Sequence, residues 1–190
     1  MTRFGAGDPT PEISFETFAS VSSTRLLRAA YLLCGNRQTA EDLLQTAMIR
    51  TGRRWGAARG APEAYARAVL VNLARDEARR TRRRVEEVLG DAVASRGHER
   101  HPVSDHAEQV ADRDAVLAAL AALPQRQREV IVLRFYADLS VTETAAAIGA
   151  SQGTVMSYTS RALARLRDLL GERLENSDRP VKAEVQHDHR

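Results

Sequence analysis

The stretch from Leu139 to Leu170, LSVTETAAAIGASQGTVMSYTSRALARLRDLL, constrains the fold of this chain more than any other segment. Ser140 is followed three residues later by Glu143, which is the spacing of a capping box that starts a helix. Gly149 can adopt the positive φ of a tight turn, and Ser151 can cap a second helix. The segment therefore predicts a helix-turn-helix, in which the second helix is free to enter a DNA major groove.

The second helix of this pair has two distinct faces. Small or apolar residues recur at about the 3.6-residue period of a helix, and the face predicted to be buried consists of Val155, Thr159, Ala162, Leu166 and Leu170. The opposite face carries Thr154, Ser157, Ser160, Arg161, Arg165 and Asp168. Hydroxyl and guanidinium groups on an exposed helix suit base edges in its first turns and phosphates further along. An ordinary amphipathic helix is the alternative, but it requires neither the capping box nor the later turn and cap signals.

The whole chain is predicted to be all-α, with two small helical domains. Its 190 residues suffice for one large domain or two small ones, each with a modest core. Aromatic residues make up only 5% of the sequence and no segment alternates between apolar and polar residues, so nothing requires a sheet.

The sequence also predicts a cytoplasmic protein that does not insert into a membrane. Its single cysteine, Cys34, allows no internal disulfide and fits a reducing compartment. Cys34 lies in an apolar run, where a packed thiol is favoured over a reactive one. The N-terminus lacks the apolar core of a signal peptide, and no segment is long and apolar enough to span a bilayer.

Charge is distributed unevenly along the sequence. Residues 50–84 carry 11 basic and 3 acidic side chains, whereas residues 85–114 carry 3 basic and 8 acidic ones. A basic block followed by an acidic one indicates a surface for a polyanion and then an acidic, flexible linker. The predicted divisions are a flexible N-terminus (1–11), a first domain (12–84), a linker (85–111), a second domain (112–171) and a disordered tail (172–190).

Three helices are predicted in the first domain. They span residues 14–33, 39–55 and 63–84, and a loop of small residues at 56–62 precedes the third. The residues expected to face the core are Phe15, Phe18, Val21, Leu26, Ala29, Ala30, Leu32, Leu33, Ala40, Leu43, Leu44, Ala47, Met48, Thr51, Tyr65, Ala66, Val69, Leu70, Leu73 and Ala74. The outer side of the second helix is polar, which suits either solvent or a partner protein.

The C-terminal half of the third helix is crowded with arginine. Within about three turns it carries Asn72, Arg75, Asp76, Arg79, Arg80, Arg82, Arg83 and Arg84. Like charges at this density repel one another unless anions lie against them, which favours contact with nucleic acid. The helix dipole, which favours cations near a helix C-terminus, accounts for only the last few of them.

The predicted linker offers one alternative site. His98, His101 and His106 lie there with acidic neighbours, but their spacing matches no standard set of metal ligands. Neither a metal nor a cofactor is therefore predicted.

The second domain is expected to open at a cap near Asp112. Pro124 is predicted to end one helix and start the next, from which Arg126 and Arg128 should point outward. Gly171 is predicted to end the last helix.

Two helical halves with these features resemble the extracytoplasmic-function (ECF) sigma factors of bacteria, which contain only domains 2 and 4 of the sigma-70 family. The resemblance covers about residues 12–170 and rests on three motifs in order. AEDLLQTAM (40–48) resembles the helix that binds RNA polymerase, and AYARAVLVNLARDEARRTRRR (64–84) resembles the helix that reads the minus-10 promoter element. LPQRQREVIVLRFYADLSVTETAAAIGASQGTVMSYTSRALARLR (123–167) is similar to the module that reads the minus-35 element.

This resemblance implies a specificity subunit of RNA polymerase rather than an enzyme. Its implied partners are the clamp of the polymerase large subunit and promoter DNA, and an anti-sigma factor is left open as a third. The implied polymerase contacts are Asp42, Leu43, Gln45, Thr46 and Arg50. The implied minus-10 contacts are Arg59, Asn72, Arg75, Asp76, Arg79, Arg80 and Arg83. The implied minus-35 contacts are Ser151, Gln152, Thr154, Met156, Ser157, Tyr158, Arg161 and Arg165.

The resemblance also assigns a role to the loop at 56–62, which is similar to the family's segment that captures a flipped base. Extracting a base costs a few kcal/mol, and a pocket beside a cationic helix offsets that cost. The chain departs from the family pattern at Thr46, where an acidic residue is usual, and at Met156 and Tyr158, where basic residues are common. We therefore expect weak minus-35 binding with a shallow salt dependence, and strong reliance on the arginine-rich helix.

Two functions of other classes are alternatives. The helix-turn-helix also resembles the output module of LuxR-like transcription regulators, which lack the basic helix at 64–84. A metal-dependent nuclease using the histidine group would need paired carboxylates, a phosphate loop or an activated nucleophile, and the sequence shows none of these.

Overall fold

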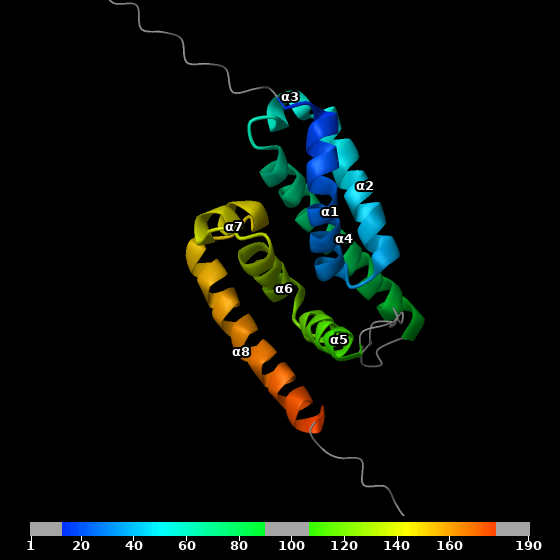
Figure 1. Ribbon diagram of the computed structural model, residues 1–190, viewed down its shortest axis with the longest axis vertical. Helices are drawn as coiled ribbons and strands as arrows, with labels where there is room; N and C mark the ends of the chain where they lie inside the picture. Colours follow the sequence, from blue (N-terminus) through cyan, green and yellow to red (C-terminus); the bar gives the residue numbers. More distant parts are fainter. Residues whose placement is uncertain (1–12, 90–106, 178–190) are drawn as a thin grey trace, which may run out of the picture.

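The computed structural model describes residues 13–89 and 107–177, and all regular secondary structure in these ranges is helical (Figure 1). The first half contains α1 (Phe15–Cys34), α2 (Arg37–Arg53), the single turn α3 (Trp55–Ala58) and α4 (Pro62–Leu89). The second half contains α5 (Ala107–Ala121), α6 (Gln125–Ile131), its π-helical continuation η1 (Val132–Tyr136), α7 (Val141–Ile148) and α8 (Gln152–Ser177). The prediction of an all-α fold is confirmed.

Helix ends follow local capping signals. The Ser14 hydroxyl accepts a hydrogen bond from the Thr17 N–H at 3.2 Å and starts α1, and Gly35 ends that helix with a φ of 74°. The Asn36 side chain then accepts from the Thr39 N–H at 2.9 Å and starts α2. Two residues therefore suffice to turn the chain between antiparallel helices.

The predicted loop at 56–62 is partly helical. Trp55 opens the extra turn α3, and its ring centroid lies 5.4 Å from that of Phe15 and 5.5 Å from that of Phe18. Gly52 permits this cluster, because a Cβ there would lie 3.2 Å from the Phe15 ring. These contacts between residues far apart in sequence stabilise a turn that the small residues alone do not predict.

Three other helix boundaries differ from those predicted. α4 continues to Leu89 and α5 begins at Ala107, so both enter the segment assigned to the linker. α8 passes through Gly171 to Ser177, because the good helix formers that follow this glycine outweigh its modest cost. The histidine group, residues 1–11 and the end of the tail lie outside the described residues.

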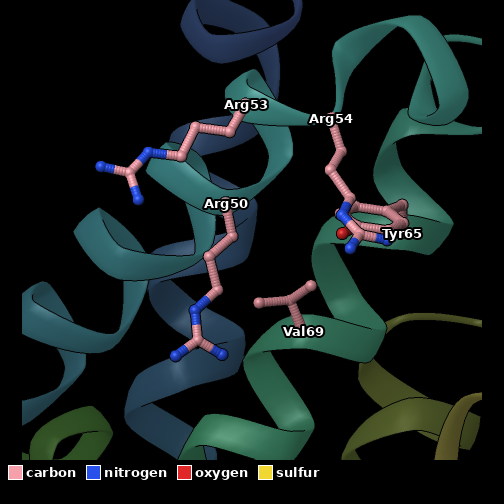
Figure 2. A pocket seen from close by; sticks show the side chains of 5 residues that line it. All are labelled: Arg50, Arg53, Arg54, Tyr65 and Val69. Atoms are coloured by element: carbon pink, nitrogen blue, oxygen red, sulfur yellow. The ribbon is translucent and has the colours of Figure 1, made fainter.

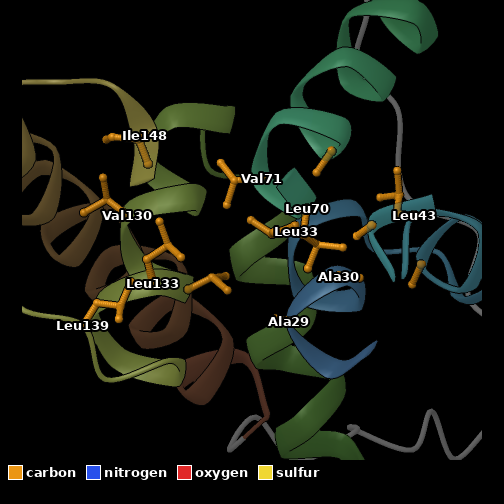
Figure 3. Packing of buried hydrophobic residues seen from close by; sticks show 14 of the residues in the cluster. Ala29, Ala30, Leu33, Leu43, Leu70, Val71, Val130, Leu133, Leu139 and Ile148 are labelled. Atoms are coloured by element: carbon orange, nitrogen blue, oxygen red, sulfur yellow. The ribbon is translucent and has the colours of Figure 1, made fainter. Parts of the chain in front are cut away.

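The two halves pack around one shared hydrophobic cluster (Figure 3). Leu33, Leu70 and Val71 of the first half lie in this cluster together with Val130 and Leu133 of the second. The cluster extends to α2, α7 and α8, and its other buried members are Ala29, Ala30, Ala40, Leu43, Ala47, Ala74, Val132, Leu139, Ala145, Ile148 and Val155. Each half was expected to bury its own core, but the described helices bury their largest cluster between the halves.

Arg128 is buried, and the prediction that it points outward is wrong. Its guanidinium donates to four main-chain carbonyls, those of Leu120 (2.8 Å), Ala121 (2.6 Å), Leu123 (3.2 Å) and Leu33 (2.9 Å). Leu120 and Ala121 lie in the last turn of α5, where carbonyls lack partners within the helix, and Leu123 follows two residues later. The fourth belongs to α1, so one side chain joins the two halves. Burial lowers the pKa of the Arg128 guanidinium.

Two predictions about α1 have different outcomes. Val21 was expected to face the core but is 74% exposed, because the helix turns that position away from α2 and α4. Cys34 is a free, half-buried thiol that donates a hydrogen bond to the Asn36 carbonyl at 3.2 Å. Burial raises the pKa of this thiol, which fits the predicted packed cysteine.

Candidate nucleic-acid interface

The arginine-rich part of α4 is exposed on the surface of the first half. Asn72, Asp76, Arg79, Arg80 and Arg83 all face solvent. Asp76 pairs with Arg79 at 3.8 Å and Glu77 pairs with Arg80 at 3.4 Å, both within the helix and both exposed enough to be weak. These acids leave a cationic excess, since residues 79–84 contain five arginines and no acid.

Arg75 is the exception on α4, because it is turned toward the second half. Its side chain is only 14% exposed and binds the Glu129 carboxylate through two nitrogens, at 2.7 and 3.2 Å. The third nitrogen lies 3.3 Å from the Asn72 amide oxygen. In this arrangement of the helices α6 covers Arg75, so its guanidinium is not free for DNA, and its predicted DNA contact stays a prediction.

A shallow cationic pocket of about 300 Å³ lies where the end of α2 meets the start of α4 (Figure 2). Arg50, Arg53 and Arg54 line it from α2 and the residue after it, and Tyr65 and Val69 line it from α4. In Figure 2, Arg50 and Arg54 extend along the side of α4, whereas Arg53 points away from them. No ion pair to these three arginines occurs in the described ranges 13–89 and 107–177, so the charge of the pocket is not neutralised within the fold.

This pocket belongs to the same face of α4 as the predicted minus-10 residues. Tyr65, Val69, Asn72 and Asp76 follow one another at intervals of three or four residues, which places them on one side of the helix. Arg59, at the end of α3, is exposed beside the start of this face. The sequence predicts no binding role for Arg53, Arg54 or Tyr65 and implies a polymerase contact for Arg50. Only the packing of α2 on α4 brings these residues together.

The helix-turn-helix has the predicted local geometry. The Glu143 N–H donates to the Ser140 hydroxyl at 3.1 Å, and the Ser140 N–H donates to the Glu143 carboxylate at 2.8 Å. Gly149 has a φ of 65°, and the Ser151 hydroxyl accepts from the Thr154 N–H at 3.1 Å. Hydrogen bonding to Ser140, through its side chain and then its backbone, lowers the pKa of the Glu143 carboxyl.

The predicted reading residues of α8 divide into two groups. Exposed members are Ser151, Gln152, Met156, Arg161 and Arg165. Thr154, Ser157 and Tyr158 are half-buried, and Tyr158 packs against the shared cluster. Met156 is 62% exposed, so an apolar side chain stands at the centre of the presented face. Buried Val155 and Ala162 hold the opposite face against the rest of the molecule, as predicted.

The outer face of α2 presents most of the residues predicted to contact polymerase. Asp42 and Gln45 are exposed and Thr46 is half-buried. Leu43 is only 8% exposed and belongs to the shared cluster, so it packs α2 against the core, and its predicted polymerase contact stays a prediction. Ile49, for which the sequence predicts no role, is 48% exposed on this face.

Comparison with known proteins assigns both halves to one family. Residues 21–84 match the family Sigma-70 region 2, and residues 119–168 match Sigma-70, region 4. The chain belongs to the ECF sigma factors of the sigma-70 family. The region 2 match covers the basic helix that LuxR-like regulators lack, so the regulator alternative is not favoured.

Relatives of this sigma factor include proteins of similar length. The RNA polymerase sigma-E factor of Streptomyces avermitilis is 40% identical over 173 residues, which is 90% of each chain. The ECF RNA polymerase sigma factor SigM of Mycobacterium tuberculosis is 34% identical over 149 residues, 77% of this chain and 72% of SigM. Among solved structures, RpoE of Bartonella quintana in complex with the anti-sigma factor NepR superposes with a TM-score of 0.69 at 26% identity, over 83% of this chain and 96% of RpoE.

Two further properties concern the described part of this sigma factor. None of its helices combines the length and apolar character needed to cross a bilayer. No group of three or more potential metal ligands occurs within residues 13–89 and 107–177.

Proposed function

We propose that this sigma factor binds RNA polymerase core in the cytoplasm, directs it to promoters and carries out no catalysis of its own. The observation that carries the proposal is the order of two family regions on one chain, each with an exposed polar face suited to DNA. Region 2 supplies an arginine-rich helix and region 4 supplies a capped helix-turn-helix. We assign these roles to residues 12–84 and 112–171, respectively.

The proposed minus-10 surface runs along α4 from the cationic pocket toward its arginine-rich end. Tyr65 and Val69 offer an apolar surface for an unstacked base, while Arg50 and Arg54 can hold the adjacent phosphates. Asn72, Asp76, Arg79, Arg80 and Arg83 continue the surface, with Arg59 at its other end. This assignment moves Arg50 from the polymerase contacts to the DNA contacts.

The proposed minus-35 surface lies on the first turns of α8. Ser151, Gln152, Thr154 and Ser157 suit base edges and the phosphates beside them, and Arg161 and Arg165 suit phosphates. Met156 can pack on a thymine methyl group, and Tyr158 contributes mainly to packing. Asp42, Gln45, Thr46 and Ile49 form the proposed polymerase face, and an anti-sigma factor, such as the one bound by the RpoE neighbour, is a further proposed partner.

Transcription in vitro with purified core polymerase and a pool of genomic fragments tests this proposal. We expect discrete start sites that depend on the added sigma factor. Double substitution of Arg161 and Arg165 by Ala should weaken these starts, whereas Arg167→Ala, an exposed arginine of the same helix outside the proposed surface, should not. Absence of specific initiation from every fragment would overturn the proposal.

A further inference from the structure

Among the DNA contacts that the sequence implies on α4, Arg75 alone is withdrawn from solvent. All three of its guanidinium nitrogens are engaged: Nε and Nη2 with Glu129 at 3.2 and 2.7 Å, and Nη1 with Asn72 at 3.3 Å. A two-pronged arginine–carboxylate pair uses the same donors that would grip a phosphate. Arg75 therefore cannot hold DNA and Glu129 at the same time.

Arg75 is the main partner of Glu129 while α6 lies on α4, because its ion pair is the shorter of the two that Glu129 makes. The Glu129 side chain is 0% exposed, so water cannot take the place of the arginine. Gln125 and Arg126 of its own helix also donate to the carboxylate, each at 3.4 Å, and these longer contacts are weaker than the pair with Arg75. A buried carboxylate stripped of its main partner is strongly unfavourable, so loss of the pair favours separation of the two helices.

Other contacts hold α6 and η1 against the first half. Arg128 donates to the Leu33 carbonyl of α1 at 2.9 Å, and the Tyr136 hydroxyl donates to the Arg25 carbonyl of α1 at 3.3 Å. Val130 and Leu133 lie in the same cluster as Leu70 and Val71. The Arg75–Glu129 pair is thus one part of a continuous interface between the halves.

The geometry points to a self-inhibited state in which Glu129 takes the place of a DNA phosphate on Arg75, and DNA binding by α4 requires release of α6. The closed arrangement itself rests on the contacts above, and only its inhibitory meaning rests on the proposed function. When the form of a protein that can bind its ligand is a minor population of about 0.1–10%, the apparent affinity is the intrinsic affinity multiplied by that fraction. Weakening the pair should therefore raise the affinity of the free chain for DNA by about tenfold or more.

The test compares the full-length free protein with Glu129→Gln, which keeps the shape of the side chain and removes its charge. The probe is a fluorescent, short single-stranded DNA of random sequence, because the promoter is not needed to detect an uncovered cationic helix. We expect Glu129→Gln to bind about tenfold more tightly and to show a larger radius of gyration in small-angle X-ray scattering. Circular dichroism confirms that each variant remains helical.

Glu41→Gln is the matched control. Glu41 also pairs with an arginine, Arg37 at 3.0 Å, but this pair is exposed on α2, away from α6. Removal of either carboxylate changes the net charge equally, so a general electrostatic gain in DNA affinity would occur in both variants. Release of α6, by contrast, would occur in Glu129→Gln and not in Glu41→Gln.

A second variant covers the case in which Glu129→Gln fails to fold. Glu129→Asp keeps the charge but shortens the side chain, so it should weaken the pair less and produce a smaller gain in affinity and size. The inference is overturned when the folded variants at position 129 remain as compact as the wild type and bind DNA no better than Glu41→Gln. If Glu129→Gln expands but no variant binds DNA, the existence of a closed state in the wild type is supported. Its inhibitory role and the proposed function are then both overturned.

Discussion

α4 and α8, the two helices proposed to contact DNA, are built in opposite ways. α4 is rich in arginine and packs against α1, α2 and α7, with Arg75 already bound inside the protein. α8 presents hydroxyls and an exposed methionine in its first turns and only two arginines, Arg161 and Arg165, within the proposed contact set. The difference indicates that charge-driven affinity is concentrated on α4, where Arg75 is already paired within the protein, while α8 contributes selectivity with less charge.

The largest expected effect tests Arg128, the residue of α6 that is anchored on α1 and on the end of α5. Arg128→Ala removes this donor from the carbonyls of Leu33, Ala121 and Leu123 and from that of Leu120, which keeps only the Leu123 N–H at 3.1 Å. Each buried polar group left unsatisfied costs about 1–3 kcal/mol, so the free energy of unfolding should fall by about 3 kcal/mol or more. Denaturant unfolding measures the change, and a loss under about 1 kcal/mol would contradict the anchoring role.

Arg167→Ala is the control for this substitution. Arg167 is an exposed arginine of α8, and its removal should change the unfolding free energy by less than about 0.5 kcal/mol.

The next effect compares the tyrosines of the two helices in DNA binding. Tyr65→Leu removes a ring that can stack on an unpaired base, so affinity for single-stranded DNA should fall by about 1–3 kcal/mol. Tyr158→Leu, the same change in α8, should leave that affinity unchanged because Tyr158 packs against the shared cluster. Equal losses in a fluorescence titration of both variants would remove the proposed distinction between the helices.

A smaller effect concerns the scaffold that presents α8. Ser140→Ala removes the cap of α7 and should lower the unfolding free energy by about 1 kcal/mol. Because the pKa of Glu143 is lowered in the folded state, ionised Glu143 stabilises the fold at pH values above the usual range of glutamate, and that contribution is lost as the pH falls below this range.

Unfolding measured as a function of pH tests the linkage. The pH dependence of stability at the acidic end should be shallower in Glu143→Gln than in the wild type. Identical acid profiles for the two proteins would show that the capping box contributes no such linkage.

The smallest effect is a gain on the weakly charged helix. Met156→Arg adds a cation to the exposed first turns of α8, so it should steepen the salt dependence of duplex binding by about 0.9 in the slope of log K against log salt. Affinity measured across a salt series checks this change. An unaltered slope would mean that position 156 does not approach the phosphates, and would weaken the view that α8 is limited by charge.

Sequence patterns predicted those features of the fold that depend on neighbouring residues. The caps at Ser140 and Ser151 and the turn at Gly149 follow from spacing alone, since each involves atoms within a few residues. The helical class and the buried stripe of α8 followed from periodicity for the same reason.

Features that depend on distant parts of the chain were missed. Nothing near Arg128 indicates that the end of α5 and a carbonyl of α1 converge on it, and the usual expectation for an arginine between polar neighbours is exposure. Arg75 and Glu129 are 54 residues apart, and the cationic pocket combines side chains from two helices. The sequence therefore predicts the candidate site as separate surfaces, and it does not predict the Arg75–Glu129 contact that joins them.

The partners of Arg128 have a consequence for how this part of the molecule can vary in evolution. All four acceptors are main-chain oxygens, which every amino acid provides. Substitutions at the corresponding positions of α1 and α5 that preserve the helix ends leave the anchor intact, so selection for it acts almost entirely on a single codon. Lysine there would keep the charge, but it has three donors on one atom in place of a planar fork of five and could not reach all four carbonyls.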